Sequence, residues 1–526
     1  MSNFLRRVCT ARRALQRANL VRLYATEATN LSEGNAKPSL YGQPLFQSHP
    51  HLLKPQELTP GIPSEDYEQR RRKLMDGLPD NSLVVCVAAP IKYMSGSTHI
   101  VSDFPQSSGI TLHFDSQSYK FRQASDFWYL TGFEEPDSAV ILEKTSSSRG
   151  YRMTLFCNGK DAAKEKWEGA KTGLNEAAII FRADDARSID QFSTHLKSSL
   201  AAYSHVYVDV PPTHTRRGPR ATSKSVLKHL APPVEARSDY DVIVDSLSTK
   251  RKPLAPEVAK LRAIKSAAEQ RVMRMAADIS GRAHAKTMRF TRPGISEAAL
   301  AAHFEYLCAL SGAQRMAYVP VVASGPNALI IHYTSNNHLV RQDELILIDA
   351  GCEYNGYASD ITRTYPASGK FTAPQRDLYA AVLAAQKQLV SLCHEAADLS
   401  LHDLHRRSCD LLRQELKQLG FNLKGSELES VLYPHFLSHP IGVDLHESSN
   451  FDRGGSLRAG MVVTIEPGIY VPPTANFPKS FHNIGIRIED EVLVGKTDSV
   501  VLSVSAPKEI VDVEGACQGL LGLEPL

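Results

Sequence analysis

The sequence predicts an α+β protein with an N-terminal α/β domain followed by a C-terminal domain built from a duplicated α+β unit. Three observations support this fold class. At about 100–200 residues per domain, a chain of 526 residues is long enough for more than one domain. Helical and strand-like segments alternate between residues 62 and 235. Beyond residue 250, two helical stretches each lead into a group of strands.

Composition and charge exclude several classes of protein. Apolar residues make up 42% of the chain and charged residues 22%, which excludes a disordered, collagen-like or coiled-coil protein. Residues 1–26 hold six arginines and no acidic residue, which leaves 54 basic and 57 acidic residues elsewhere. A nucleic-acid-binding surface needs clustered basic residues on the folded part, so we expect no nucleic-acid partner. No apolar run approaches the roughly 20 residues that span a bilayer, so we expect no transmembrane segment.

Residues 1–26 have the arginine-rich, acid-free composition of a mitochondrial transit peptide. A disordered basic tail is the alternative interpretation. Residues 22–25 also resemble a two-step processing site, in which a first cut follows Leu23 and Tyr24 is then removed. We therefore expect a mitochondrial protein, in the matrix or on the matrix face of the inner membrane. Residues 27–60 have little apolar periodicity and are predicted to be a linker.

An N-terminal α/β domain is predicted over residues 61–240. Residues 67–75 have helical character, and turn or breaker residues separate the strand-like runs that follow. These runs are residues 82–88, 127–132, 139–144, 153–157 and 206–210.

A C-terminal domain is predicted over residues 250–510. Helices are expected within residues 253–291 and, after a cap at Ser296, over residues 298–310. Strands then follow at residues 318–323, 344–350 and 357–365. A second round has helices at residues 374–397 and 401–419 and strands at residues 461–471 and 484–494. Because this order repeats, we expect a duplicated unit with a sheet between the helices.

The strongest local signal is Asn355-Gly356 between two apolar runs, which predicts a β-hairpin with a two-residue turn. In that register Asp349 lies opposite Thr362, and Asp360 is the diagonal neighbour of Asp349 on the same face, with backbones about 7–8 Å apart. If this pair is buried, it must be protonated, matched by cations or bound to metal. The alternative is that both carboxylates point to solvent.

Further candidate ligands end other apolar runs. His435, His439 and His446 fall within one segment of twelve residues, and Glu466 and Glu489 end strand-like runs. His439 is the candidate ligand because a neutral imidazole suits divalent transition metals, although a lone histidine is more often a core or surface residue. Two aspartates, one histidine and two glutamates make up the donor inventory of a two-metal site. Oxygen-rich ligation favours Mn²⁺, while cobalt, iron and zinc also fit.

With these residues in this order, the chain resembles the pita-bread metallopeptidases and, within them, aminopeptidase P, the Xaa-Pro aminopeptidases. The resemblance is dense from about residue 315 to 495 and thinner in the N-terminal domain, and residues 1–60 lie outside it. Its motifs are residues 331–334, the hairpin, residues 435–447, residues 466–470, residues 487–490 and, more thinly, residues 121–133. It implies that residues 250–510 are a pita-bread catalytic domain.

The resemblance also implies a ligand set of two divalent metal ions. Asp349 would be a terminal ligand of one ion, His439 and Glu466 would be ligands of the other, and Asp360 and Glu489 would bridge both.

Catalytic and substrate-binding roles follow from the same resemblance. Glu466 would handle the proton of the nucleophilic water. His332 and His446 would hydrogen-bond the scissile carbonyl and the tetrahedral intermediate. His435 would line the pocket for the residue after the cut, and Arg487 would orient the Glu489 side of the site. For the last two, packing within the fold is an equal alternative.

The implied activity is that of a dinuclear-metal aminopeptidase that removes one residue from peptide or protein N-termini. Together with the transit peptide, this resembles the mitochondrial Xaa-Pro aminopeptidase 3 or intermediate-cleaving type, which removes one bulky residue left by the main processing peptidase. A prolidase-like dipeptidase is the nearest alternative. A metal-free creatinase-like enzyme and a non-catalytic binding protein are disfavoured because every ligand position is filled. The oligomeric state stays open, with a homodimer as one candidate.

Overall fold

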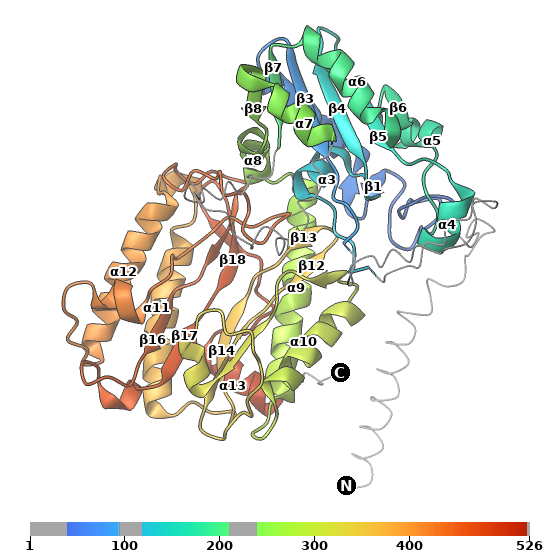
Figure 1. Ribbon diagram of the computed structural model, residues 1–526. Coiled ribbons are helices and arrows are strands. Elements are labelled where there is room, and N and C mark those ends of the chain that lie inside the picture. Colours follow the sequence, from blue (N-terminus) through green and yellow to red (C-terminus); the bar gives the residue numbers. More distant parts are fainter. Residues whose placement is uncertain (1–38, 93, 95–117, 210–238, 523–526) are drawn as a thin grey trace, which may run out of the picture.

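The computed structural model of the chain describes residues 39–92, 94, 118–209 and 239–522, which form two domains, one above the other in Figure 1. The observed architecture is α+β, as predicted. The predicted transit peptide, residues 1–26, lies outside the described residues. The described part of the predicted linker brings Leu45 and Leu58 into the core of the N-terminal domain. None of the described helices combines the length and the apolar character of a membrane span.

A six-stranded mixed sheet forms the centre of the N-terminal domain. Its strands lie in the order β6 (Asp185–Ser188), β5 (Tyr151–Cys157), β4 (Ala139–Lys144), β3 (Ser82–Val87), β7 (His205–Val208) and β8 (Arg251–Pro253). A short hairpin, β1 (Glu57–Thr59) and β2 (Ile62–Pro63), precedes it. The helices are α2 (Ser64–Gly77), α3 (Ser125–Thr131), α4 (Ala162–Glu168), α5 (Leu174–Ile180), α6 (Phe192–Ser199) and α7 (Asp239–Ser246). Because alternate strand residues face opposite sides, Val84 shares a core with α2 and α3, whereas Leu83 and Val85 share one with α6 and α7.

One predicted strand, residues 127–132, is instead the helix α3. All residues from Phe127 to Thr131 are buried, and the periodicity of such a run cannot distinguish a buried strand from a buried helix. Asp126 lies in the first turn, where a negative charge favours a helix.

The C-terminal domain places its strands between α11 and α12 on one side and α9, α10 and α13 on the other (Figure 1). Its helices are α8 (Ala255–Ala263), α9 (Ala267–Phe290), α10 (Glu297–Leu310), α11 (Ala373–Ser391), α12 (Leu401–Gln418) and α13 (Ile510–Gln518). Its strands are β9 (Arg315–Met316), β10 (Val321–Ser324), β11 (Leu345–Asp349), β12 (Cys352–Tyr354), β13 (Tyr357–Ala358), β14 (Thr362–Pro366), β15 (Val462–Ile465), β16 (Gly468–Val471), β17 (Ile484–Arg487), β18 (Asp490–Val494) and β19 (Ser499–Val501). Capping boxes at Ser266, Thr372 and Ser400 begin α9, α11 and α12. Two rounds of helices and strands are present, as predicted.

The structure confirms the register of the hairpin. Asp349 at the end of β11 pairs with Thr362 at the start of β14, so no residue is inserted between the turn and this pair. Asn355 has a φ of 50° and Gly356 a φ of 81°, the two positive values that a type I′ turn requires. The predicted second strand is interrupted, however, because the chain leaves the ladder between β13 and β14, and Asp360 lies in this interruption.

The turn of the hairpin packs against the N-terminal domain. The rings of Tyr357 and Trp128 meet edge to face with 5.8 Å between their centroids. Arg70 of α2 donates a hydrogen bond of 3.1 Å to the Tyr357 hydroxyl. The hairpin therefore joins the two domains at one end and reaches the candidate site at the other.

We expect Gly356→Ala to destabilise the protein more than Gly420→Ala does. Both glycines have a positive φ, but a Cβ at Gly420 would meet nothing within 4 Å, whereas one at Gly356 would come within 2.6 Å of the Trp128 ring. Gly420→Ala should cost about 1 kcal/mol of backbone strain. Gly356→Ala should cost about 1–3 kcal/mol more. Chemical denaturation of the full chain measures both losses, and equal losses would contradict the packing of the turn.

Candidate metal centre

A single cavity of about 990 Å³ in the C-terminal domain collects every residue that the sequence analysis selected. The selected residues on its wall are His332, Asp349, Asp360, His435, His439, His446, Glu466, Arg487 and Glu489. Asp349 and Arg487 are the last residues of β11 and β17, and the others lie in loops between helices and strands.

Asp360, His439 and Glu489 form the centre of this group. Each offers one donor atom, and these atoms all lie within 4.8 Å of one another. The His439 Nε2 atom is 3.2 Å from Asp360 Oδ2 and 3.7 Å from Glu466 Oε1. A carbonyl oxygen, that of Pro440, lies 3.2 Å from His439 Nδ1. This contact places a ring proton on Nδ1, so Nε2, which faces the acids, is the nitrogen that a metal ion could bind.

Asp349 joins the group through Tyr318. The Tyr318 hydroxyl lies 2.5 Å from Asp349 Oδ1 and 2.5 Å from Asp360 Oδ1, between the two acids. A hydroxyl has one proton, so it can donate to one of these oxygens at a time. The two aspartates therefore converge on one point, although Asp360 lies in the interruption between β13 and β14 and not in the ladder that the predicted diagonal pairing assumed.

Arg487 supplies positive charge beside Asp349. Its Nη2 atom donates to Asp349 Oδ2 at 2.5 Å, and its Nη1 atom donates to the Tyr470 hydroxyl at 2.7 Å. Its Nε atom donates to Thr362 Oγ1 at 3.0 Å, and Thr362 in turn donates to Glu489 Oε2 at 2.6 Å. Arg487 thus holds Asp349 directly and reaches Glu489 through Thr362.

Asp360 and Glu489 are buried, Asp349 and Glu466 are partly buried beside them, and the pKa values of the four carboxylates reflect this crowding. Burial, together with nearby Asp360, raises the pKa of Glu466 to about 8. Burial and the neighbouring acids raise the pKa of Glu489 well above its usual range. Burial also raises the pKa of Asp349, with Asp360 adding to it against Arg487. For Asp360, burial opposes ionisation, but the hydrogen bond from His439 keeps its pKa low.

Such a group is short of positive charge. Buried carboxylates must be protonated, paired or bound to metal, and in the part of the chain that the structure describes these four acids are matched by Arg487 and, when it is protonated, His439. Carboxylate oxygens with one imidazole nitrogen are suitable ligands for divalent cations. The residues present therefore fit a centre for divalent metal ions.

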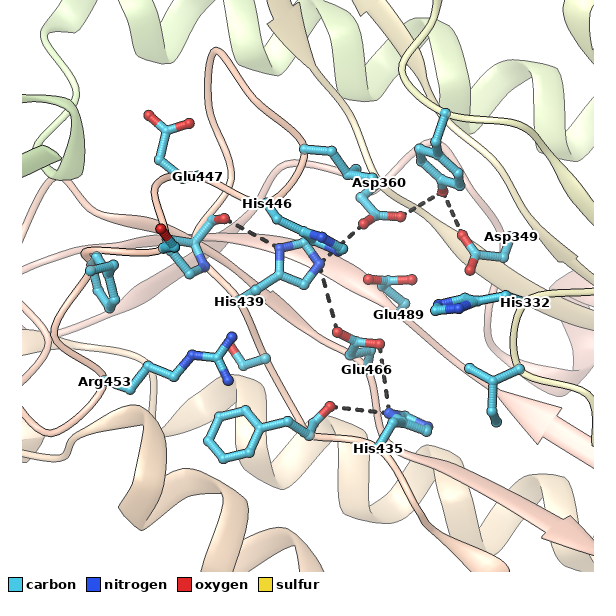
Figure 2. Close-up of a pocket in the computed structure, with 18 of the residues that line it drawn as sticks. His332, Asp349, Asp360, His435, His439, His446, Glu447, Arg453, Glu466 and Glu489 are labelled. Atoms are coloured by element: carbon cyan, nitrogen blue, oxygen red, sulfur yellow. Dashed lines mark hydrogen bonds and ion pairs between the residues drawn. The ribbon is translucent and has the colours of Figure 1, made fainter. Parts of the chain in front are cut away.

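The other histidines differ in their surroundings. The His446 ring lies against the edge of His439, with 4.4 Å between the centroids. His435 Nε2 lies 3.0 Å from the Tyr470 hydroxyl, and burial lowers the pKa of His435 to about 3, so this ring is neutral. His332 lies on the opposite wall, near Asp349 and Glu489 in Figure 2.

Sequence reasoning missed Tyr318, Thr362 and Tyr470, which hold the acids, Arg487 and His435 in place. Thr362 could have been found, because the predicted hairpin register puts it opposite Asp349. Tyr318 and Tyr470 carry no such local signal, because their contacts are made by residues far away in the chain.

Comparisons with known proteins find relatives of this chain over most of its length. A family model described as metallopeptidase family M24 matches residues 271–496, and one described as aminopeptidase P, N-terminal domain, matches residues 109–207. The chain is 38% identical over 480 residues to intermediate cleaving peptidase 55 of Saccharomyces cerevisiae, covering 91% of this chain and 88% of the relative. It is 34% identical over 498 residues to Xaa-Pro aminopeptidase 3 of Homo sapiens, covering 91% of each. A mitochondrial intermediate cleaving peptidase 55 of Arabidopsis thaliana is 37% identical over 475 residues, 90% of this chain and 87% of the relative.

Solved structures are similar over nearly the same length. The crystal structure of Icp55 from Saccharomyces cerevisiae, with 58 N-terminal residues deleted, matches with a TM-score of 0.74 and 37% identity, covering 88% of this chain and 99% of that one. Aminopeptidase P from Escherichia coli, with the inhibitor Pro-Leu, matches with a TM-score of 0.73 and 30% identity, again covering 88% and 99%.

We expect Asp360→Ala to lower the metal content of the purified protein while the chain still folds. The substitution removes one of the three donors that lie together and also removes a negative charge from a crowded group. Asp452→Ala is the matched control, because Asp452 lines the same cavity but caps the Gly454 amide instead. Elemental analysis after dialysis measures the metal, and circular dichroism measures the fold. Equal metal content in both variants would contradict the assignment.

Proposed function

This chain belongs to metallopeptidase family M24, with an aminopeptidase P N-terminal domain before the catalytic domain, and we propose that it trims single residues from the N-termini of imported mitochondrial proteins. Its membership confirms the predicted fold class, an α/β domain followed by a pita-bread domain, and makes the chain a metallo-aminopeptidase. The observation that carries the proposal is the group of buried carboxylates around His439, in a cavity of the size that binds small ligands and peptide ends.

Divalent metal ions are the cofactors of this family, and the donors present here fit them. We assign two ions, which Asp349, Asp360, His439, Glu466 and Glu489 would hold. The oxygen-rich donor set favours Mn²⁺. When bound, the ions would polarise the substrate carbonyl and lower the pKa of the attacking water.

The remaining chemistry belongs to side chains of the chain. Glu466 would accept the proton of the attacking water and pass it to the leaving amine. His332 and His446, on the wall of the cavity, would donate hydrogen bonds to the carbonyl oxygen as negative charge develops on it. His435 would line the pocket for the residue after the cut. Arg487 would keep Asp349 in place through the contact already described.

The place of action and the substrates follow from the N-terminal sequence and the relatives. Residues 1–26 have the composition of a transit peptide, and the matched Arabidopsis thaliana relative is named as mitochondrial. These observations support a mitochondrial location, for which we propose the matrix or the matrix face of the inner membrane. Two of the relatives are named for intermediate cleavage, which supports a role after the main processing peptidase.

A prolidase-like dipeptidase with the same ligands is the alternative, and a peptide assay separates the two. We expect a tripeptide Tyr-Pro-Thr and a heptapeptide copy of residues 24–30 to lose their N-terminal tyrosine, because both present a free amine and a following peptide bond. An N-acetylated copy of the heptapeptide should stay intact, since the amine is blocked. Turnover confined to the dipeptide Tyr-Pro would favour a prolidase. Turnover by metal-stripped Asp360→Ala would contradict the metal mechanism.

The processing role has its own test in mitochondria. N-terminal sequencing of mitochondrial proteins, with and without this enzyme, should show a set of proteins that keep one extra Tyr, Leu or Phe when the enzyme is missing. The chain's own Tyr24 is one expected case. Identical N-termini in both samples would contradict the processing role and leave the peptidase activity untouched.

A further inference from the structure

His446 depends on its backbone for its position. In the described part of the chain its imidazole makes no hydrogen bond, and its close contact is the edge of the His439 ring, 4.4 Å between centroids. A side chain that is held only by packing takes its place from the loop that carries it. The loop from Pro440 to Glu447 therefore decides where the His446 ring lies.

The carboxylate of Glu447 is the centre of this loop. The Glu447 amide donates to the Pro440 carbonyl at 2.9 Å, and the Asp444 amide donates to Glu447 Oε2 at 3.1 Å. The Gly442 amide closes the turn on the Asp444 carbonyl at 3.1 Å. A Cβ at Gly442 would lie 2.9 Å from Glu447 Oε1, so the loop wraps the carboxylate without room for a side chain. In Figure 2, the Glu447 carboxylate points away from the metal-ligand candidates, while His446 lies beside them.

Arg262, near the end of α8, holds this carboxylate from outside the loop. Its Nε and Nη2 atoms donate to Glu447 Oε1 and Oε2, both at 2.9 Å, which is a two-bond fork. The same Nη2 atom donates to Asp444 Oδ2 at 2.6 Å. The Arg262 side chain is 4% exposed and that of Glu447 is 3% exposed, so water does not screen the pair. The Arg262 guanidinium thus binds both Asp444 and Glu447, the acids on either side of His446.

The N-terminal domain takes part in the same network. The remaining Arg262 nitrogen, Nη1, donates to Asp126 Oδ1 at 2.6 Å in the first turn of α3. Its neighbour Ser125 donates to Asp444 Oδ1 at 2.6 Å. Arg122 donates to the Val443 carbonyl at 2.7 Å. Contacts from two domains therefore converge on a loop of the catalytic domain.

We propose that Arg262 is a positioning residue for hydrolysis, which fixes the loop so that the His446 imidazole meets the substrate carbonyl. The N-terminal domain is then part of the catalytic unit through Asp126 and Ser125. This inference rests on the role proposed above for His446. The competing explanation is that Arg262 only joins the two domains and acts on stability alone.

A double-mutant cycle with His446 distinguishes positioning from simple stabilisation. Arg262→Lys keeps the charge but cannot form the two-bond fork. Because a displacement of about 1 Å can cost about 100-fold in rate, we expect Arg262→Lys to lower kcat by about 10- to 100-fold. KM and metal content should change little. In the His446→Ala background the same substitution should change kcat less than about twofold, since the residue it positions is gone.

The controls keep the test decisive. Arg71→Lys changes another buried arginine, which donates to the Tyr151 hydroxyl and the Leu130 carbonyl inside the N-terminal domain, and it should lose stability but keep its kcat. Asp126→Asn leaves Arg262 intact and serves as a second variant should Arg262→Lys not fold, with the same dependence on His446 expected. All variants are made in the full chain and assayed with the tripeptide Tyr-Pro-Thr.

Two results would overturn the inference alone: a wild-type kcat in Arg262→Lys, or equal losses of kcat with and without His446. A wild-type kcat in His446→Ala would instead refute the proposed role of His446, and the inference with it.

Discussion

Four carboxylates that share one cavity impose the constraint around which the catalytic domain is arranged. Ionised acids lose hydration when buried and repel one another, so each needs a donor or cation at a fixed place. Arg487 donates a hydrogen bond to Asp349, and Thr362 donates one to Glu489. His439 faces the group with its Nε2 atom, because its Nδ1 atom donates to the Pro440 carbonyl. This environment keeps the acids together and is completed by divalent cations.

The next residue along the chain shows how local this constraint is. Asp490 follows Glu489 and is also buried, but it is the first residue of β18 and has different partners. Arg363 donates to it at 2.7 Å, and Lys508 also pairs with it. Burial by itself would raise the pKa of Asp490, but these two cations hold it below its usual value. The pKa of Glu489 is raised instead. Arg363 also donates to the Glu489 carbonyl oxygen, so the arginine that pairs with Asp490 also holds the backbone at Glu489.

The two domains are joined where the site is built. The hairpin that carries Asp349 ends in a turn packed on Trp128, and the loop that carries His446 is gripped by Arg262 together with Asp126. Both connections put residues of the N-terminal domain against elements that end in the cavity. The arrangement explains why a domain that holds none of the candidate ligands contributes to the geometry of the centre.

Sequence alone was sufficient to predict the elements whose signals lie close together in the chain. The Asn355-Gly356 turn fixed the pairing of Asp349 with Thr362, and acids at the ends of apolar strands could be selected because solvation gives no reason for them there. Residues 127–132 were assigned wrongly because burial on all sides removes the periodicity that separates a helix from a strand. Only the tertiary structure places Tyr318 between two aspartates and Arg262 against the acids that flank His446. Those contacts join residues up to 185 positions apart, and no local propensity encodes them.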